Sequence, residues 1–469
     1  MVTKMKKQAT LGHALIPMLF IIAALIFTMQ FWGGDPHIPI LMAAVVAAVV
    51  AVFGLGYTWK ELEEGIIETI KMSTQALLIV MIIGMIIGTW ILGGIVPTMI
   101  YYGLKLLSPS IFLVATVLLC SVVSLATGSS WTTAGTVGIA LVGVGIGLGM
   151  NPGLVAGAII SGAYFGDKMS PLSDTTNLAP AMAGSTLFEH IRHMTYTTGP
   201  SLIIALILYG IIGMKFANND LDTSAINEIL TGMEANFNIS LVLFAAPLLV
   251  ILMVVFKAPA IPGLFGGALL GALFAFVFQG ADMSSIIEAM HYGYTSETGI
   301  AVIDDLLSRG GLDSMMWTLS LILCAMSFGG VMEKSGMLEA IARSILKLAN
   351  GTGSLVVATI VTVIGMNLMA GDQYLSIVIP GRMYKQIYQE RGLHPKNLSR
   401  ILEDAGTLTS PLVPWNTCGI FMAGTLGVAT LAYLPYAYLN LINPLVSIFY
   451  GFTGITMEKL PEAEAAAVA

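Results

Sequence analysis

Long apolar segments recur along the whole chain, and their lengths predict a helical membrane protein that crosses the bilayer many times. A helix needs about 20 largely apolar residues to cross the hydrocarbon core. Eight uninterrupted segments meet this requirement: 13–32, 38–56, 73–92, 197–214, 239–256, 262–280, 314–332 and 428–450. Two longer segments, 152–190 and 395–424, also cross, but glycine, proline and polar residues interrupt them. The pattern therefore predicts ten crossings, with both termini on the same side.

Two further apolar stretches, 111–147 and 353–390, each turn at a short polar segment. The first turns at 127–133, where five of seven residues carry a hydroxyl group, and the second at 371–373, which offers a carboxylate and an amide. A plain surface turn has a similar composition, but the long apolar runs on both sides favour a tip in the middle of the membrane. We therefore expect two re-entrant hairpins, because irregular backbone at that depth lies only against protein or a wet cavity.

Composition supports this fold class and excludes others. The 469 residues are 56% hydrophobic and only 10% charged, whereas about a quarter of an average soluble protein is charged. A water-soluble globule, a nucleic-acid-binding protein and a disordered chain are excluded. The three cysteines lie in apolar runs, so we expect neither disulfides nor a zinc site. No catalytic or nucleotide-binding motif is present, so we expect no enzyme activity and no cofactor.

The distribution of basic residues predicts the orientation. Lysine and arginine are enriched in cytoplasmic loops, and the following would all share one face: Lys4, Lys6, Lys7, Lys60, Lys71, Arg192, Lys257, Lys334, Arg343, Lys347, Arg382, Lys385, Arg391, Lys396 and Arg400. The loop 216–238 carries Asp220, Asp222, Glu228 and Glu234 without lysine or arginine, as expected outside. We predict a multi-pass protein of the cell membrane with both termini in the cytoplasm.

The two halves of the chain resemble each other. Segment 38–41 corresponds to 261–264; segments 124–129 and 151–154 correspond to 367–372 and 394–397 at an offset of 243; segments 170–172 and 182–184 correspond to 410–412 and 422–424 at an offset of 240. The loop 382–400 holds five basic residues and its counterpart 139–157 holds none, so equivalent loops face opposite sides. This pattern predicts two inverted-topology repeats, the architecture of many secondary transporters.

The predicted division of the chain follows from these repeats. It comprises an N-terminal segment with the first crossing (1–37), the first repeat (38–214), an outer loop with a linking crossing (215–260), the second repeat (261–452) and a cytoplasmic tail (453–469).

Few charged residues lie at membrane depth, where an unpaired charge is costly and indicates a functional site. They are Asp167, Lys168, Asp174, Asp372, Glu403 and Asp404. Gly166 and Pro171 break the crossing around the first three, which frees backbone carbonyls beside two carboxylates and several hydroxyls. Hard cations prefer such oxygen ligands. In the alternative interpretation, Asp167 and Lys168 neutralise each other and Asp174 only caps the second half-helix.

His190 and His193 have a spacing compatible with a metal ion. They lie beside Arg192 at the predicted inner interface, which favours an ordinary interfacial helix. A pH-sensing role is the other alternative, because histidine titrates near neutrality.

The run 166–177 (GDKMSPLSDTTN), with 292–294 (YGY), 309–311 (RGG) and 315–318 (MMWT), resembles the NhaC family of Na+/H+ antiporters over most of the chain. The resemblance implies the ion-transporter superfamily, with hairpins and broken helices in a moving transport domain and a scaffold that commonly forms a homodimer. It implies Na+ binding at Ser129, Thr132, Asp174 and Asn177, with Asp372 and Asn416 in the second repeat. The second repeat departs from a symmetric two-sodium pattern, which puts a second cation site in doubt.

These observations predict a secondary transporter that exchanges cytoplasmic Na+ for external H+. A shared Asp174 holds a proton or Na+ but not both, and Lys168 balances charge, either by keeping Asp167 ionised or by replacing the cation in the empty site. The family also contains a malate/lactate sodium antiporter branch. Coupled exchange of small carboxylates is therefore the alternative, favoured by Lys168 and by half-helix N-termini. An intramembrane enzyme or a channel is the third hypothesis.

Overall fold

The computed structural model describes residues 6–217, 223–256 and 258–460. Within these residues every regular element is a helix, and the only β-type contacts are two isolated bridges. Eight described helices are long and apolar enough to cross a membrane, and two bent helix pairs raise the number to ten. The predicted all-α polytopic fold is confirmed. Lys4, Asp220, Asp222 and Lys257, which contributed to the predicted orientation, lie outside the described residues.

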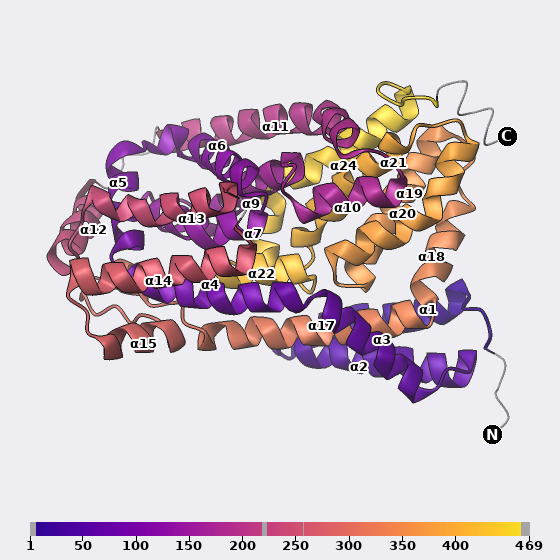
Figure 1. Cartoon of the computed structure of the whole chain (residues 1–469), viewed down its shortest axis with the longest axis horizontal. Helices are drawn as coiled ribbons and strands as arrows, with labels where there is room; N and C mark the ends of the chain where they lie inside the picture. Colours follow the sequence, from indigo (N-terminus) through magenta and orange to yellow (C-terminus); the bar gives the residue numbers. More distant parts are fainter. Residues whose placement is uncertain (1–5, 218–222, 257, 461–469) are drawn as a thin grey trace.

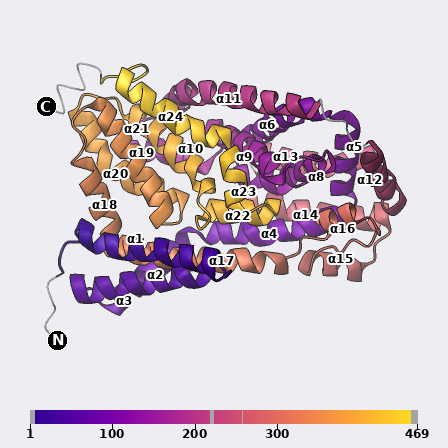
Figure 2. The same cartoon turned by 180° about the vertical axis from the view of Figure 1, so that it is seen from behind.

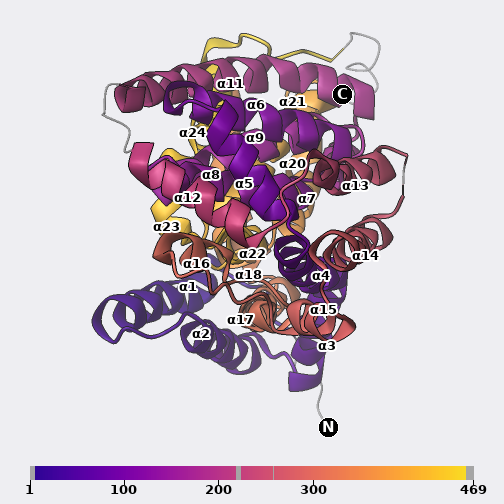
Figure 3. The same ribbon diagram turned by 90° about the vertical axis from the view of Figure 1, so that its left-hand side faces the viewer.

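The helices run mainly along the long axis of the molecule (Figure 1). Helices α1, α2, α3 and α17 lie together along one side, whereas α6, α9 and α11 lie along the other (Figures 1 and 3). The bounds are α1 Leu11–Ile26 with η1 Phe27–Phe31, α2 His37–Val49 with η2 Val50–Leu55, α3 Trp59–Met72, α6 Pro109–Thr127, α9 Pro152–Met169, α11 Leu187–Ala217 and α17 Met316–Lys334. Seen from behind, the start of α1 and the end of α24 (Tyr438–Thr453) lie at the same end of the molecule (Figure 2).

The remaining elements connect and cover these helices. They are α4 Thr74–Leu92, α5 Ile95–Leu106, α12 Thr223–Asn236, η4 Leu241–Phe244, α13 Ala245–Val255, α14 Ala260–Gln279, α15 Met283–His291, α16 Ala301–Leu307, η5 Asp313–Met315, α18 Met337–Leu346, α23 Thr430–Tyr433, η8 Leu434–Tyr436 and α24 Tyr438–Thr453.

Both predicted hairpins are present as antiparallel helix pairs. The first joins α6 to α7 (Ser130–Thr133), η3 (Ala134–Gly138) and α8 (Ile139–Gly147), and the second joins α19 (Thr352–Met369) to α20 (Gln373–Glu390). A glycine with positive φ lies at each tip, at Gly128 (φ 68°) and Gly371 (φ 66°). Glycine adopts this left-handed conformation without steric cost, which lets the chain reverse there.

Both interrupted crossings are broken helices, as predicted. In the first half, α9 ends at Met169 and α10 (Asp174–Ala183) begins after an extended break. In the second half, α21 (Pro395–Leu402) continues as the π-helix η6 (Glu403–Thr407) and the 3-10 helix η7 (Ser410–Leu412), and α22 (Thr417–Leu426) follows. The second break covers residues 413–416. Gly406 and Pro411 alone indicate an earlier break in the sequence.

The halves repeat the same succession of caps at a constant separation. The paired tip residues are Gly128 with Gly371, and the paired C-caps are Gly184 with Gly427. The paired N-caps are Ser129 with Asp372, Asn151 with His394, and Ser173 with Asn416. Each pair is 243 positions apart, so the offset of 240 for the later segments is wrong. The two hairpins open toward opposite ends of the molecule (Figure 1), as inverted repeats do. The limits 38–214 and 261–452 remain predictions.

Several predicted crossings differ in detail. The segment 428–450 is not one helix, because the chain bends by 87° between Thr417–Leu426 and Thr430–Tyr436, and the helix α24 begins only at Tyr438. Both limbs of the first hairpin count among the eight long apolar helices, whereas α1 has only 16 residues. Part of the loop 216–238 is the helix α12, bent by 92° against the segment that follows.

Candidate ion-binding site

A cavity of about 560 Å³ lies where the two hairpin tips meet the two helix breaks. Five of the seven predicted ion-binding residues line it: Ser129, Thr132, Asp167, Asp174 and Asp372. The described lining residues include three carboxylates and no lysine, arginine or histidine. Asp167 and Asp372 are 7% and 4% exposed, whereas Asp174 is exposed. The cavity therefore combines two buried acids with one accessible acid, a setting that favours cations.

Local capping positions the polar groups around the cavity. The hydroxyl of Ser129 accepts a hydrogen bond from the backbone N–H of Thr132 (3.1 Å) and so begins the short helix α7. Asp372 begins α20 in the same way, accepting from the N–H groups of Tyr374 (2.9 Å) and Leu375 (3.1 Å). Ser173 caps α10, so the cap is the residue before Asp174, and the interpretation of Asp174 as the cap is wrong.

Each hairpin tip rests on the helix break of its own repeat. Ser130, at the first tip, donates from its N–H (3.1 Å) and its hydroxyl (2.6 Å) to Oδ2 of Asp167. At the second tip, the Thr417 hydroxyl donates to Oδ2 of Asp372 (3.4 Å), and the Thr417 N–H donates to the Gly371 carbonyl (2.8 Å). These bonds fix the carboxylates relative to the tips.

The repeats are chemically related at the cavity, with the acids exchanged. Ser410 and Gln373 of the second repeat are hydrogen-bonded (3.4 Å) at the positions equivalent to Asp167 and Ser130. Asp372 and Thr417 lie at the positions equivalent to Ser129 and Asp174. In the first repeat the acid of this second pair is Asp174, which lies on the half-helix α10. In the second repeat the acid is Asp372, which lies at the hairpin tip. This exchange explains why the second break lacks an acid of its own although the second half contributes one to the cavity.

Lys168 pairs with Asp404 of the second repeat, and both side chains are fully buried. The expectation that Lys168 balances the charge of Asp167 is therefore wrong, because Lys168 pairs with Asp404 and Asp167 bonds to Ser130. The interpretation that Asp167 and Lys168 neutralise each other is wrong for the same reason. Asp404 also accepts from the Thr197 hydroxyl (2.9 Å) and the Asn443 amide (2.6 Å).

The two predicted asparagines lie away from the cavity lining. The Asn177 amide donates to the carbonyls of Pro171 (2.9 Å) and Ser173 (2.7 Å), so it fastens the first break. Asn416 caps α22 by accepting from the Cys418 N–H (3.0 Å) and donates to the Asn367 side chain (3.1 Å). The structure gives both residues a local structural role at a break.

His190 and His193 do not lie on an exposed interfacial helix. Both are buried against α21, where His190 Nδ1 meets the Ser399 hydroxyl (2.9 Å) and His193 Nε2 meets the Asn397 side-chain oxygen (3.2 Å). Arg400, predicted in the basic inner loop, is also buried. No group of three potential metal-ligating side chains exists in the described part of the chain, so the spacing of the histidines reflects helix packing.

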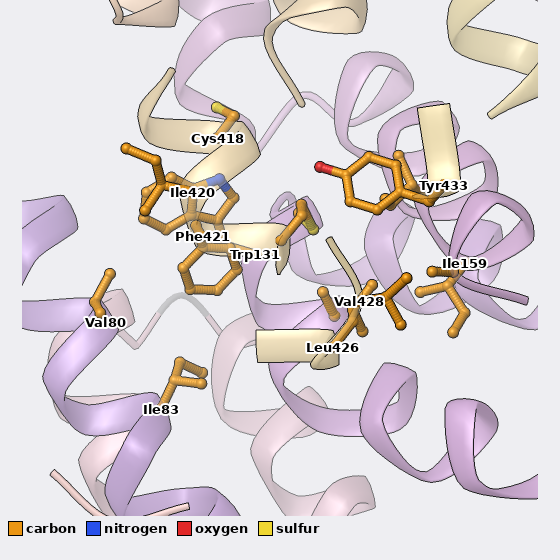
Figure 4. Packing of buried hydrophobic residues seen from close by; sticks show 14 of the residues in the cluster. Val80, Ile83, Trp131, Ile159, Cys418, Ile420, Phe421, Leu426, Val428 and Tyr433 are labelled. Atoms are coloured by element: carbon orange, nitrogen blue, oxygen red, sulfur yellow. The ribbon is translucent and has the colours of Figure 1, made fainter. Parts of the chain in front are cut away.

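Sequence reasoning missed several residues of the cavity wall, including Gln75, Trp131 and Tyr374. Trp131, from the first tip, stacks on Phe421 of α22 with ring centroids 4.0 Å apart and planes 7° from parallel. Figure 4 shows these two rings face to face among buried apolar side chains of both repeats. The first tip therefore packs directly on the second repeat. Position next to a tip was the only signal for Trp131 and Tyr374, and Gln75, at the start of α4, had no such signal.

Broken helices and hairpin tips around an acidic, membrane-embedded cavity are the features of a secondary ion transporter. Residues 162–455 match the model of the Na+/H+ antiporter family. The chain belongs to this family. It is a multi-pass membrane protein with antiporter relatives, as the resemblance in its motifs implies.

Three relatives describe the range of the family around this chain. It is 41% identical to the Na(+)/H(+) antiporter NhaC of Alkalihalophilus pseudofirmus, over 97% of this chain and 98% of the relative. It is 39% identical to the malate-2H(+)/Na(+)-lactate antiporter of Bacillus subtilis, over 89% and 90%. It is 38% identical to the arginine/ornithine antiporter ArcD of Halobacterium salinarum, over 98% and 96%.

Proposed function

We propose that this protein exchanges cytoplasmic Na+ for external H+ by alternating access, and that it acts as a transporter and not as an enzyme. The observation that carries the proposal is the convergence of Asp167, Asp174 and Asp372 on one cavity whose described walls contain no basic residue. Oxygen ligands of this kind suit a hard cation. The family and the 41% identical relative named as a Na+/H+ antiporter support the same cargo.

The exchange follows from competition at the carboxylates. Asp174 is accessible from the cavity and lies beside the hydroxyl-bearing first tip, so Na+ bound there takes the place of a proton. Charge neutralisation by either cation lowers the cost of moving the site through a low-dielectric region, whereas the empty anion is costly. Only the loaded forms then change sides, and inward H+ movement drives Na+ outward.

The walls of the cavity indicate its present access. Gln75 at the start of α4, Ala258 before α14 and Ala260 at the start of α14 line it. The orientation predicted from basic residues assigns these two connections to the cytoplasmic side. We infer that the described conformation is open to the cytoplasm.

The test measures Na+-dependent proton movement in inverted membrane vesicles with a pH-sensitive dye. Asp174→Asn and Asp372→Asn should each lower the initial rate by at least about tenfold, because each removes an ionisable ligand. Asp282→Asn is the matched control, since this acid lies on an exposed N-cap of α15, remote from the cavity. Unchanged rates in both cavity variants would refute the proposal.

The exchange of acids between the repeats offers a sharper version of this test. Asp174→Thr alone should abolish activity, whereas Ser129→Asp combined with Asp174→Thr reproduces the tip acid and half-helix hydroxyl of the second repeat. We expect the double variant to recover activity to within about tenfold of the wild type. Failure to recover, in a folded double variant, would show that the carboxylate must lie on the half-helix.

Coupled transport of a small organic ion is the second candidate. The volume of about 560 Å³ is in the range of small-molecule pockets and exceeds what a bare Na+ requires. The relatives named as malate/lactate and arginine/ornithine antiporters make these compounds the probes to use. The acidic walls suit a cationic amino acid directly, and a carboxylate only together with Na+. Flux in Na+ alone, then with each organic ion added, separates the two candidates.

A further inference from the structure

A second group of buried charges lies behind the cavity wall, where the two repeats meet. Lys168 of α9 pairs with Asp404 of η6, and the guanidinium of Arg400 lies 3.8 Å from the second oxygen of Asp404. None of these three side chains has exposed surface. The cluster includes a π-helical turn, a distortion that is frequent at functional sites.

Glu403, the first residue of this turn, is the member without a partner. It is fully buried, and neither carboxyl oxygen has a hydrogen-bond partner among the described residues. The hydroxyls of Thr175 and Thr407 face it without bonding geometry, and that of Thr407 also lacks a partner in the described chain. An unpaired ionised carboxylate at such a position is costly, whereas a protonated one costs less. Glu403 is therefore a site for a proton.

The charges around Glu403 make its protonation state consequential. Glu403 faces Lys168 and Asp167 from α9, Arg400 and Asp404 lie on its own segment, and His190 of α11 faces Lys168. Asp167 belongs to the cavity, where it bonds to Ser130, so the buried group itself holds two cations with Asp404 and has one excess positive charge. Ionised Glu403 neutralises this excess and protonated Glu403 does not. Binding or release of one proton thus changes the net charge of the contact between the repeats.

Two residues border both Glu403 and the transport cavity. Thr175 lines the cavity and also faces the Glu403 carboxyl, and Asp167 likewise faces both. A cation that enters beside Asp167 and Asp174 adds positive charge on the cavity side of this wall. Positive charge favours the ionised form of a nearby carboxyl group.

We propose that Glu403 is a second proton-binding carboxyl group of the transport cycle, connected to the cavity through Thr175. When Na+ enters, the Glu403 O–H bond breaks, the carboxylate keeps the electron pair, and the proton leaves past the Thr175 hydroxyl into the aqueous cavity. When Na+ has left, a proton from the other side returns by the same route. This inference rests on the proposed Na+/H+ exchange and adds to it a proton site distinct from the Na+ ligands.

The test counts protons released when Na+ is added to the purified protein in a weakly buffered detergent solution, with Na+ binding measured separately by isotope. Glu403→Gln should bind Na+ but release about one proton fewer than the wild type. Glu64→Gln, on an exposed position of α3, is the control and should release as many protons as the wild type. Equal release by wild type and Glu403→Gln would overturn the inference, whereas Na+ binding without any proton release in the wild type would overturn the exchange itself.

A second pair of variants keeps the inference testable if Glu403→Gln fails to fold. Thr175→Val removes the hydroxyl between cavity and carboxyl, and Thr175→Ser retains it. Proton release after rapid Na+ mixing should slow by about tenfold or more in Thr175→Val and stay near the wild-type rate in Thr175→Ser. The infrared band of a protonated carboxylic acid should also disappear on Na+ addition to the wild type. Equal rates in both threonine variants, or no band change, would refute the route.

Discussion

Asp167 and Lys168 are adjacent in sequence, yet they belong to different parts of the site. Successive residues on a helix point about 100° apart, so neighbours do not face each other. Asp167 faces Ser130 at the first hairpin tip, whereas Lys168 faces Asp404 in the other repeat. One turn of α9 therefore holds a carboxylate in the cavity and inserts a cation into the contact between repeats.

The buried pair of Lys168 and Asp404 provides a stability prediction. Lys168→Met should lower the free energy of unfolding by about 3–5 kcal/mol, because removing one member leaves a buried charge without its partner. Combining it with Asp404→Leu should not recover the loss, because the buried Arg400 guanidinium then loses its neighbouring carboxylate as well. Unfolding in mixed detergent micelles, followed by tryptophan fluorescence, measures both changes.

The matched control for this pair is the ion pair of Lys396 with Glu458 (2.6 Å), whose glutamate side chain is 53% exposed. Lys396→Met should have a much smaller effect, since solvent screens such a pair. If Lys396→Met and Lys168→Met destabilise the protein equally, the buried pair has no special role.

At the residue scale, the sequence predicted the acids of the cavity better than their partners. Asp167, Asp174 and Asp372 stood out because a carboxylate is costly in an apolar segment. The family resemblance implied Asn177 and Asn416 as further ligands, but each is used to fasten a helix break. Whether an amide serves a ligand or the backbone depends on local geometry, which residue type does not reveal. Lys168 found its partner 236 positions away, beyond any local pattern.

Among the elements, α9 packs tightly against the first limb of the hairpin at Gly166. A Cβ atom added at Gly166 would lie 2.4 Å from both the Leu125 nitrogen and the Ser121 oxygen. Because these are backbone atoms, the helices would have to separate. The glycine thus brings the residue that follows it, Asp167, within reach of the tip.

Gly166→Ala should therefore cost about 1–3 kcal/mol of stability through overpacking and reduce Na+-dependent transport. Gly199→Ala is the control, because Gly199 is also helical but has no atom within 4 Å of an added Cβ. That change should be neutral or stabilise by about 0.5–1 kcal/mol. Thermal unfolding in detergent and vesicle transport measure both effects, and wild-type behaviour of Gly166→Ala would show that the contact can relax.

The N-terminal segment is held at the start of α3 by one acidic side chain. Glu61 contacts Lys6 (2.7 Å) and completes a capping box by accepting from the Thr58 N–H (2.9 Å) and hydroxyl (3.0 Å). The Lys6 ammonium, followed by the bonds from Thr58, lowers the pKa of Glu61 from 4.5 to about 2. α3 is not among the candidate membrane-spanning helices of the described chain.

The sign of this shift sets the pH dependence. A carboxyl with a lowered pKa stabilises the folded arrangement above its ordinary pKa, and this contribution is lost as the pH falls from about 4.5 toward 2. Hydrogen exchange at the Lys7 amide, which bonds to the Leu55 carbonyl (2.9 Å), should accelerate over that range after correction for intrinsic rates. Glu61→Gln should remove this dependence and Glu63→Gln, on an exposed neighbour, should keep it.

The existence of the elements was predictable, and their limits were less so. Apolar length identified the crossings and polar tips identified the hairpins. The apolar composition of 428–450 predicts one helix, yet Gly427 (φ 69°) ends α22 and a bend follows. Apolar residues satisfy a helix, a turn buried in protein and a lipid-facing surface alike, so composition alone does not locate such a bend.

For the whole molecule, the repeat depends on conformation more than on residue identity. Ser173 and Asn416 differ in type but both cap the second half of a broken helix, at a separation of 243. Matching the Ser-Pro-Leu runs instead gave 240, because identical residues can occupy different turns. The side chains of Ser124 and Asn367, also equivalent, both donate to equivalent carbonyls, at Ala163 and Gly406 (2.8 Å for the latter). Sequence identity detects the repeat, and capping geometry sets its register.

Alternating access requires that the cavity open to each side in turn, and Leu172 allows this to be measured. It is 41% exposed, lines the cavity and lies against the first hairpin tip at Gly128. The three native cysteines are buried, so background labelling is low. In the cytoplasm-open conformation, Leu172→Cys should react with a membrane-impermeant thiol reagent in inverted vesicles. Ser285→Cys lies at an exposed position of α15, near the end of the molecule opposite to the predicted cytoplasmic side. It should react only in right-side-out vesicles.

The effect of ions then distinguishes a transporter from a static pore. Under an imposed Na+ or H+ gradient, labelling of Leu172→Cys from the outside should increase and labelling from the inside should decrease. The reason is that the site is open to only one side of the membrane at a time. Saturating Na+ without a gradient should slow labelling from either side, since the ion and the first tip occupy the space beside the thiol. A channel would instead show simultaneous reactivity from both sides, and a cavity with a fixed opening would stay unreactive from the outside under every gradient. Two inverted repeats whose tips and breaks enclose a single acidic cavity predict the remaining outcome. In that outcome, labelling from one side increases while labelling from the other side decreases.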